Sequence, residues 1–237
     1  MMEKKYLDEN AVKKFFEMNF NKDSEIHDPK WYLERVPDSF YTNKKSRELI
    51  HMSDDNYEDN VSIWTFHTYG MTHGFYCKPS WDWIDPLANY LNGKKVIDIM
   101  AGNGLISLCL KHRGIDIDAC DRAIGDDNEY CSHRSWNFPT ICGEKFIVEQ
   151  AKKGVIYDTL LMIWPEYNGD ESDKKICDIF LRLNPDGEII FIGEDEGGCT
   201  GSAYFFDNYE LNWIWELSKH YTPDFGIYDG IFRATKR

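Results

Sequence analysis

The sequence predicts an α/β protein with a doubly wound, mostly parallel sheet, because strand-like and helix-like segments alternate from residue 81 onward. The clearest strand is the apolar run KVIDIM at 95–100, and an amphipathic helix pattern follows it at 105–112. Strands that are separated by helices require right-handed crossovers, which set neighbouring strands parallel. In such a sheet, ligands bind beyond the carboxyl ends of the strands.

The other elements follow from the same two periodicities. Further strands are expected at 115–120, 157–163 and 188–193, and further helices at 82–91, 145–152, 171–183 and 203–218. The helix at 203–218 is predicted because Phe206, Tyr209, Trp213 and Leu217 share one helical face. Segment 126–154 is the hardest to assign, and we expect a helix there and then a strand near PTICG. The tail GIYDGIFRATKR is expected to form a hairpin or a strand.

The first 80 residues differ from the rest in their sequence pattern, since they carry many aromatic residues but little periodicity. We expect two parts, an N-terminal cap or lid at 1–80, mainly helical or irregular, and a core at 81–237. The cap contains one amphipathic helix pattern at 11–19. His67 and His73 lie in an aromatic setting, where a histidine is a candidate general base or a packed side chain.

Composition restricts the function. The chain has 237 residues and a formal net charge of −14 without a basic stretch, so nucleic acid is an unlikely partner and a neutral or cationic substrate is favoured. No apolar run approaches the ~20 residues of a membrane span, and no signal peptide is visible, so we expect no membrane partner and a cytoplasmic location. The seven cysteines lack zinc-ligand spacing, so no metal is expected. The oligomeric state is not indicated.

The first strand contains an acid and ends in a glycine loop. Asp98 lies within the strand, and Gly102 and Gly104 follow at the turn, where glycines let the backbone approach a ligand. Asp121 ends the second strand at about the twenty-residue spacing that suits an acid binding ribose hydroxyls. A structural turn and a solvated or helix-capping Asp121 are the plainer alternatives. A carboxylate at Asp98 would repel a pyrophosphate and suit a cationic amino-acid group.

The stretch VIDIMAGNGLIS resembles motif I of the class I S-adenosylmethionine-dependent methyltransferases, in which an acid precedes G-x-G-x-G. Met100 stands where the motif has its first glycine. The resemblance covers residues 95–237 and implies a seven-stranded Rossmann-like sheet with S-adenosylmethionine as cofactor. It places Asp98 and the loop at the amino-acid part, Asp121 at the ribose and Glu144 as a candidate at the adenine. The implied cofactor-binding residues are Asp98, Met100, Ala101, Gly102, Asn103, Gly104, Asp121, Arg122 and Glu144.

The strand at 157–163 ends in Trp-Pro-Glu-Tyr, where amino-methylating branches of that family carry (D/N/S)-P-P-(Y/F/W). The resemblance makes Trp164, Pro165, Glu166 and Tyr167 the candidate catalytic residues. The Pro165 carbonyl would accept from the target amine, and Tyr167 would stack on the substrate. Glu166 either pairs with a cationic amine or faces solvent. Glu194, after the next strand, is a candidate substrate ligand or part of a solvated loop.

The expected function is S-adenosylmethionine-dependent methyl transfer to a small molecule or to a protein or peptide amine, with nitrogen favoured over oxygen as acceptor. An aminopropyl transferase of the polyamine-synthase type is one alternative. A cofactor-binding partner protein without catalysis is another. An NAD-dependent oxidoreductase would fit the glycine loop but not Asp98.

Overall fold

The computed structural model describes residues 76–77, 81–122, 136–167, 170–195, 198–221, 223 and 227–237. The helix expected at 11–19, His67 and His73 lie outside these residues. The expected division into a cap and a core therefore stays a prediction. Within the described part of the chain, no helix is long and apolar enough to cross a membrane.

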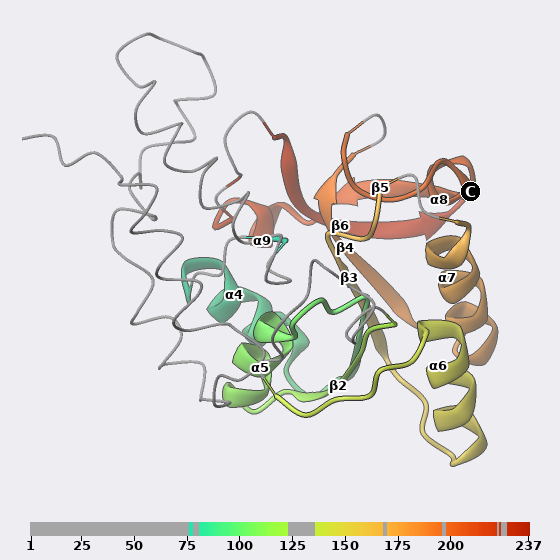
Figure 1. Ribbon diagram of the computed structural model, residues 1–237. Helices are drawn as coiled ribbons and strands as arrows, with labels where there is room; N and C mark the ends of the chain where they lie inside the picture. The colour runs from blue at the N-terminus through green and yellow to red at the C-terminus, as the bar shows by residue number, and fades with distance from the viewer. Residues whose placement is uncertain are drawn as a thin grey trace, which may run out of the picture.

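A mixed six-stranded sheet forms the centre of the protein, with the order β2-β1-β3-β4-β6-β5 (Figure 1). Its strands are β1 (Lys95–Ile99), β2 (Asp116–Cys120), β3 (Thr159–Ile163), β4 (Glu188–Glu194), β5 (Tyr209–Trp213) and β6 (Asp229–Lys236). The first four are mutually parallel, as predicted, whereas β6 runs antiparallel to both β4 and β5. The predicted strand in the tail is confirmed as β6.

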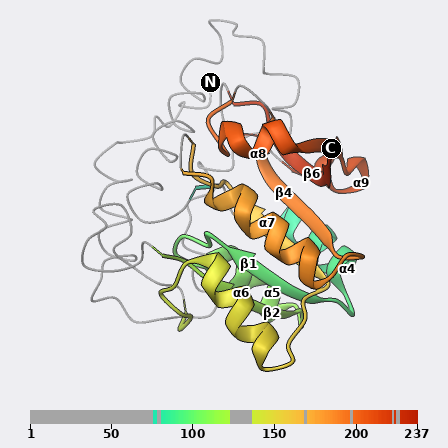
Figure 2. The ribbon, with the colours of Figure 1, turned by 90° about the vertical axis from the view of Figure 1, so that its right-hand side faces the viewer.

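Helices cover both faces of the sheet (Figures 1 and 2). One face carries α4 (Trp81–Leu91), α5 (Leu105–His112) and α9 (Trp215–Ser218), and the other carries α6 (Gly143–Lys152), α7 (Ser172–Leu183) and α8 (Ala203–Asn208). Alternate residues of the strands supply the two cores. In β1, for example, Val96 packs towards α4 and α5, while Ile97 and Ile99 pack towards α6 and α7.

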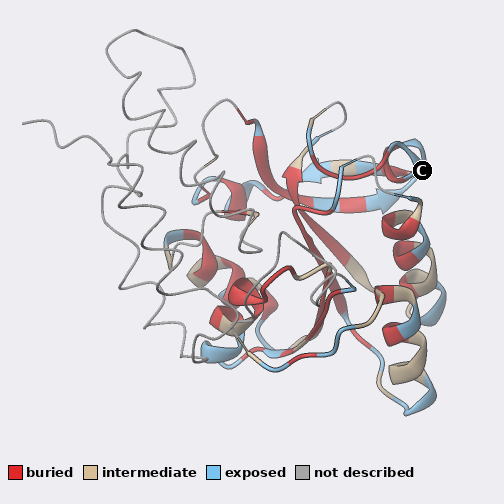
Figure 3. Ribbon diagram, viewed as in Figure 1, coloured by how far each residue is buried: buried red, intermediate tan, exposed pale blue. Residues whose placement is uncertain are grey.

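Burial follows from this double cover. All five residues of β3 are buried, and so are four of the five in β1 (Figure 3). A parallel strand covered on both faces is expected to be a continuous apolar run. The polar exception in β1 is Asp98, whose side chain is 1% exposed. A carboxyl group in this position needs a reason beyond packing.

Two sequence predictions are corrected by the structure. The strand expected near 139–143 is reduced to a single parallel bridge between Asp121 and Thr140, so the described residues form six strands rather than seven. The helix expected at 203–218 is wrong, because its middle is strand β5. The aromatic side chains have helical spacing, but the backbone of β5 pairs with β6 instead. Trp213, which was expected to face the core from this helix, is 55% exposed.

Candidate functional site

The strand order reverses between β1 and β3, so the candidate site is the edge where these two strands end. Both strands end in an unusual backbone conformation. Met100, directly after β1, has a φ of 54°, and Trp164, directly after β3, has a φ of 52°. Residues other than glycine rarely adopt this left-handed region, which costs about 1–3 kcal/mol and is concentrated at functional sites. Met100 holds the positive φ where the resembling motif has glycine.

The glycine loop after β1 uses its own N–H groups internally. Ala101 donates to the Cys120 carbonyl at 3.2 Å, and Gly104 donates to the Ala101 carbonyl at 2.9 Å. Leu105 N donates to Asn103 Oδ1 at 3.0 Å, so the buried Asn103 side chain supports the start of α5. A loop that binds phosphate must direct free N–H groups at it. This loop has the glycines of a nucleotide site, but the N–H groups of Ala101, Gly104 and Leu105 are used within the protein.

Asp121 lies at the end of β2 and joins this strand to the glycine loop. Its Oδ2 accepts a hydrogen bond of 2.9 Å from Gly102 N, and its side chain is 9% exposed. The predicted acid is therefore beside the loop, as expected for a ribose-binding residue. It also has a structural role, because it fixes the loop against β2. Whether it also binds a ribose stays a prediction.

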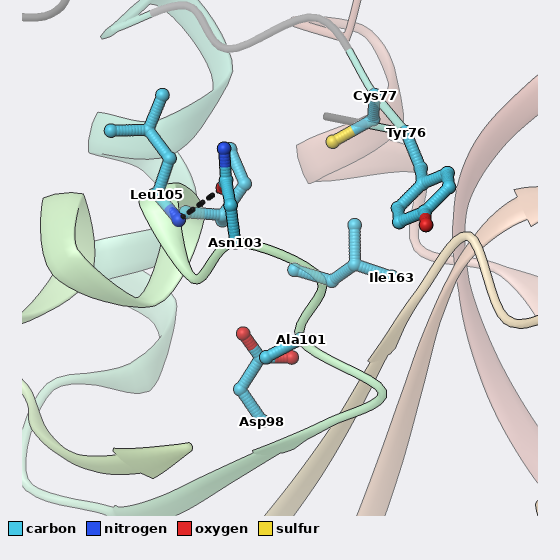
Figure 4. Close-up of a pocket in the computed structure, with 8 residues that line it drawn as sticks. Tyr76, Cys77, Asp98, Ala101, Asn103, Leu105 and Ile163 are labelled. Atoms are coloured by element: carbon cyan, nitrogen blue, oxygen red, sulfur yellow. Dashed lines mark hydrogen bonds between the residues drawn. The ribbon is translucent and has the colours of Figure 1, made fainter. Parts of the chain in front are cut away.

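Asp98 lies beneath the loop and faces a small cavity. The cavity has a volume of about 20 Å³, and Figure 4 shows the Asp98 carboxylate directed towards Ala101 at its edge. The residues that line it are Tyr76, Cys77, Asp98, Ala101, Asn103, Leu105, Ile106 and Ile163. Among the described residues, Oδ1 of Asp98 has no hydrogen-bond partner. Burial, with a smaller contribution from the charge of Asp121, raises the pKa of Asp98 to about 8, although a hydrogen bond with Ser107 opposes the shift.

Two aromatic side chains cover the other side of the loop. Trp136 Nε1 donates to the Gly104 carbonyl at 3.1 Å, and Phe138 packs against Trp136 with ring centroids 5.6 Å apart. Gly104 has a φ of 76°, and a Cβ at this position would overlap the Phe138 ring. The glycine is therefore required both by its backbone conformation and by the close approach of these rings.

Trp164 is a buried residue of the predicted catalytic corner. Its indole is 7% exposed, and Nε1 donates to Asp229 Oδ2 at 3.1 Å. The Tyr221 hydroxyl donates to the same oxygen at 2.6 Å. Trp164 thus connects the end of β3 to β6 through a buried carboxylate. Its N–H faces Asp229, and its ring packs in the core on the α4 and α5 side of the sheet.

Pro165 is buried as well, whereas Glu166 and Tyr167 are exposed. The Pro165 carbonyl accepts from Gly201 N at 3.0 Å, and Tyr167 is 53% exposed. Glu166 pairs with Arg122 at 2.9 Å, and Arg122 also contacts Asp170 at 3.3 Å. The structure therefore brings Glu166, expected at the substrate, together with Arg122, expected at the cofactor. The charge of Glu166 is balanced within the protein.

Glu194 and Glu144 are the remaining predicted acids, and both are half-buried. The two carboxylate oxygens of Glu194 accept from Cys199 N at 2.6 Å and Tyr228 N at 3.1 Å, so this side chain organises the loop after β4. Glu144 is half-buried in the first turn of α6. Nothing in its contacts tests the expected role at an adenine.

Sequence reasoning missed several residues of this site. Tyr76 and Cys77 line the cavity although they precede α4, on the cap side of the predicted boundary. Trp136 and Phe138 cover Gly104 from a segment without clear periodicity. The signal that was available is compositional, because all four are aromatic or sulfur-containing residues next to predicted elements. Their proximity to the glycine loop depends on long-range packing.

Comparison with known proteins gives matches to solved structures alone. No family model and no curated protein matches the sequence. One similar structure is a SAM-dependent methyltransferase from Agrobacterium tumefaciens, at 14% identity and a TM-score of 0.40, with 66% of this chain aligned. The aligned part spans 60% of the Agrobacterium chain.

Two further similar structures contain the cofactor or its product. A SAM-dependent methyltransferase from Bacteroides fragilis, in complex with S-adenosyl-L-homocysteine, is 18% identical over 67% of this chain and 78% of that chain, with a TM-score of 0.35. The magnesium protoporphyrin IX methyltransferase of Synechocystis PCC 6803, with bound SAM, is 13% identical over 99% of each chain, with a TM-score of 0.38. At these values we infer no activity from the likenesses.

Proposed function

We propose that the protein binds S-adenosylmethionine and transfers its methyl group to an amine of a small molecule or of a protein or peptide. The observation that carries the proposal is the buried Asp98 at the reversal of strand order, with one oxygen lacking a hydrogen-bond partner among the described residues. A buried carboxyl beside a nucleotide-type glycine loop suits a ligand that brings a positive charge. S-adenosylmethionine has such an ammonium group on its amino-acid part.

The hydrogen bonds of the loop support a nucleoside without phosphates. The N–H groups of Ala101, Gly102, Gly104 and Leu105 are donated within the protein. A pyrophosphate would have to displace these bonds and approach Asp98, which is unfavourable on both grounds. An NAD-dependent oxidoreductase therefore fits this loop less well than an S-adenosyl-dependent enzyme.

The residues present fit the cofactor in two places. Asp98 would hold the ammonium group, and Asp121, fixed by Gly102 at the end of β2, would accept from the ribose hydroxyls. When bound, the cofactor supplies an electrophilic methyl group on a sulfonium. The contribution of the protein is to hold an acceptor in line with that methyl and to exclude water, which is worth up to ~7–11 kcal/mol in ideal cases.

The acceptor is proposed from the corner after β3. Pro165 and Tyr167 keep two positions of the amine-methylating pattern, and the exposed Tyr167 is available to stack on a substrate. The Pro165 carbonyl has a second lone pair beside its bond to Gly201. Since Arg122 balances Glu166, a cationic amine would compete with Arg122 for this carboxylate.

Binding is tested by calorimetric titration of S-adenosylmethionine, S-adenosylhomocysteine and NAD. We expect both S-adenosyl compounds to bind, and Asp121→Asn to weaken them roughly 10- to 100-fold, the loss of hydrogen bonds to a charged group. Asp186→Asn, at an exposed turn, is the matched control and is expected to change nothing. Binding of NAD without binding of either S-adenosyl compound would overturn the proposal.

Transfer is tested with S-adenosylmethionine labelled in the methyl group or in the amino-acid carbons. A panel of small amines, peptides and hydroxyl compounds serves as acceptors. Label from the methyl on an amine supports the proposal, whereas label from the carbon chain would indicate transfer of a 3-amino-3-carboxypropyl group. The aminopropyl alternative is tested in the same way with decarboxylated S-adenosylmethionine as the donor. Tight binding with no transfer to any acceptor would favour the non-catalytic partner protein.

A further inference from the structure

The cavity above Asp98 is matched in size to one small polar group. Its volume of about 20 Å³ exceeds the ~10–15 Å³ that a single water needs, and an ammonium group is of similar size. Leu105, Ile106 and Ile163 form apolar walls, and Asp98 Oδ1 faces no hydrogen-bond donor among the described residues. A donor that enters this cavity would satisfy a buried acceptor that is otherwise left unpaired.

Among the residues that the structure describes, no cation balances the charge of Asp98. On the β2 side it neighbours Cys120 and the carboxylate of Asp121, and on α5 it meets the Ser107 hydroxyl. On β3 its partner in register is Leu161, followed by Ile163. Of the residues before α4 that the structure describes, the two titratable ones, Tyr76 and Cys77, both line the cavity. Within the described part of the chain, the charge that acts on Asp98 is therefore the negative one of Asp121, and Asp98 itself is 1% exposed.

We propose that this cavity is a proton-coupled ammonium subsite, in which Asp98 is protonated in the free protein and releases its proton when the α-ammonium of the ligand enters. The step balances in charge and atoms. The carboxylic acid becomes a carboxylate, the ammonium keeps its proton and pairs with that carboxylate, and one proton leaves to solvent. The inference rests on the proposed function, and it adds a pH dependence and a means of selecting ligands that carry an ammonium.

The physical cause is the burial of an acid for which the described residues supply no positive partner. Desolvation disfavours the charged form, and the pKa of Asp98 rises from the usual 3.8 to about 8. A cation in contact reverses this preference, because it offsets the cost of the buried charge. Below pH 8, the ligand must displace a proton, so its affinity falls as the pH falls.

The decisive comparison uses S-adenosylhomocysteine and 5′-methylthioadenosine. Both contain an adenosyl thioether, but methylthioadenosine lacks the amino-acid part and its ammonium. Calorimetry at pH 7 in buffers of different ionisation enthalpy gives the number of protons released. We expect close to one proton for S-adenosylhomocysteine and none for methylthioadenosine. Between pH 7 and pH 6, the dissociation constant of S-adenosylhomocysteine should rise about tenfold, and that of methylthioadenosine should stay constant.

The outcomes separate the two proposals. Binding of S-adenosylhomocysteine without proton release, or with the same pH dependence as methylthioadenosine, overturns the subsite and leaves the proposed function standing. Failure of both adenosyl compounds and of S-adenosylmethionine to bind overturns the proposed function and the subsite with it. Asp98→Asn should bind S-adenosylhomocysteine without proton release, and a release equal to that of the wild type would also overturn the subsite.

A second measurement needs no ligand. Because the folded-state pKa of Asp98 is raised, its contribution to stability is complete below about pH 4 and is lost as the pH rises towards 8. The urea midpoint of the wild type should therefore fall, relative to that of Asp98→Asn, between pH 5 and pH 8. The exposed control Asp186→Asn should follow the wild type. A constant difference between wild type and Asp98→Asn over this range would overturn the protonated state.

Discussion

Substitution of Gly104 by alanine tests how closely the aromatic cover packs on the glycine loop. A Cβ at Gly104 would overlap the Phe138 ring and lie 2.9 Å from Trp136 Nε1. For alanine, the backbone strain at the φ of 76° costs about 1–2 kcal/mol. Alanine also lowers the conformational entropy of the unfolded chain, which offsets about 0.4–1 kcal/mol of this cost. Overpacking adds about 1–3 kcal/mol. We expect Gly104→Ala to lower the free energy of unfolding by about 2–4 kcal/mol.

Gly114 provides the matched control, because it has a φ of 86° and nothing within 4 Å of its Cβ position. Gly114→Ala carries the strain without the overlap, so its expected loss is about 1 kcal/mol. The assay is urea unfolding of both variants, with the m-value checked for a change in the two-state transition. Equal losses for Gly104→Ala and Gly114→Ala would refute the close packing of Trp136 and Phe138 on the loop.

Two further predictions concern carboxylates that accept several hydrogen bonds, the buried Asp229 and the half-buried Asp178. Trp164→Phe removes the indole donor to Asp229 and should cost about 1–3 kcal/mol in urea unfolding. The variant Tyr221→Phe removes a second donor to Asp229, and strict additivity in the double variant would contradict a shared network. Burial alone would raise the pKa of Asp178, but hydrogen bonds from side chains that include Lys236 lower it to about 2. Asp178→Asn should therefore cost about 1–3 kcal/mol at pH 7. That difference from the wild type should shrink as the pH falls from 4 towards 2, and a difference that stays constant over this range would refute the ion pairing.

The site illustrates how far sequence reasoning reaches. The glycine loop, the acid within β1 and the acid after β2 were all predicted, and the structure brings Asp98, Gly102 and Asp121 together. The corner after β3 was predicted as a location, but its contacts were not. Trp164 meets Asp229, which lies 65 residues later, and Glu166 meets Arg122, which lies 44 residues earlier. Such pairs depend on strand order, which no local pattern specifies.

The sequence by itself determined the position of the loop and the strand and helix alternation over 81–120 and 145–194, because periodicity and glycine turns are local properties. The tertiary structure decided the secondary structure within 203–218, where residues 209–213 pair with β6 as a strand in place of the expected helix. It also decided that Asp98 is enclosed by Ile163 and Cys77, from segments far apart in the chain. The physical reason is that burial and register arise from the whole sheet. Packing of the whole sheet therefore makes Asp98 a desolvated carboxyl group beside a cavity.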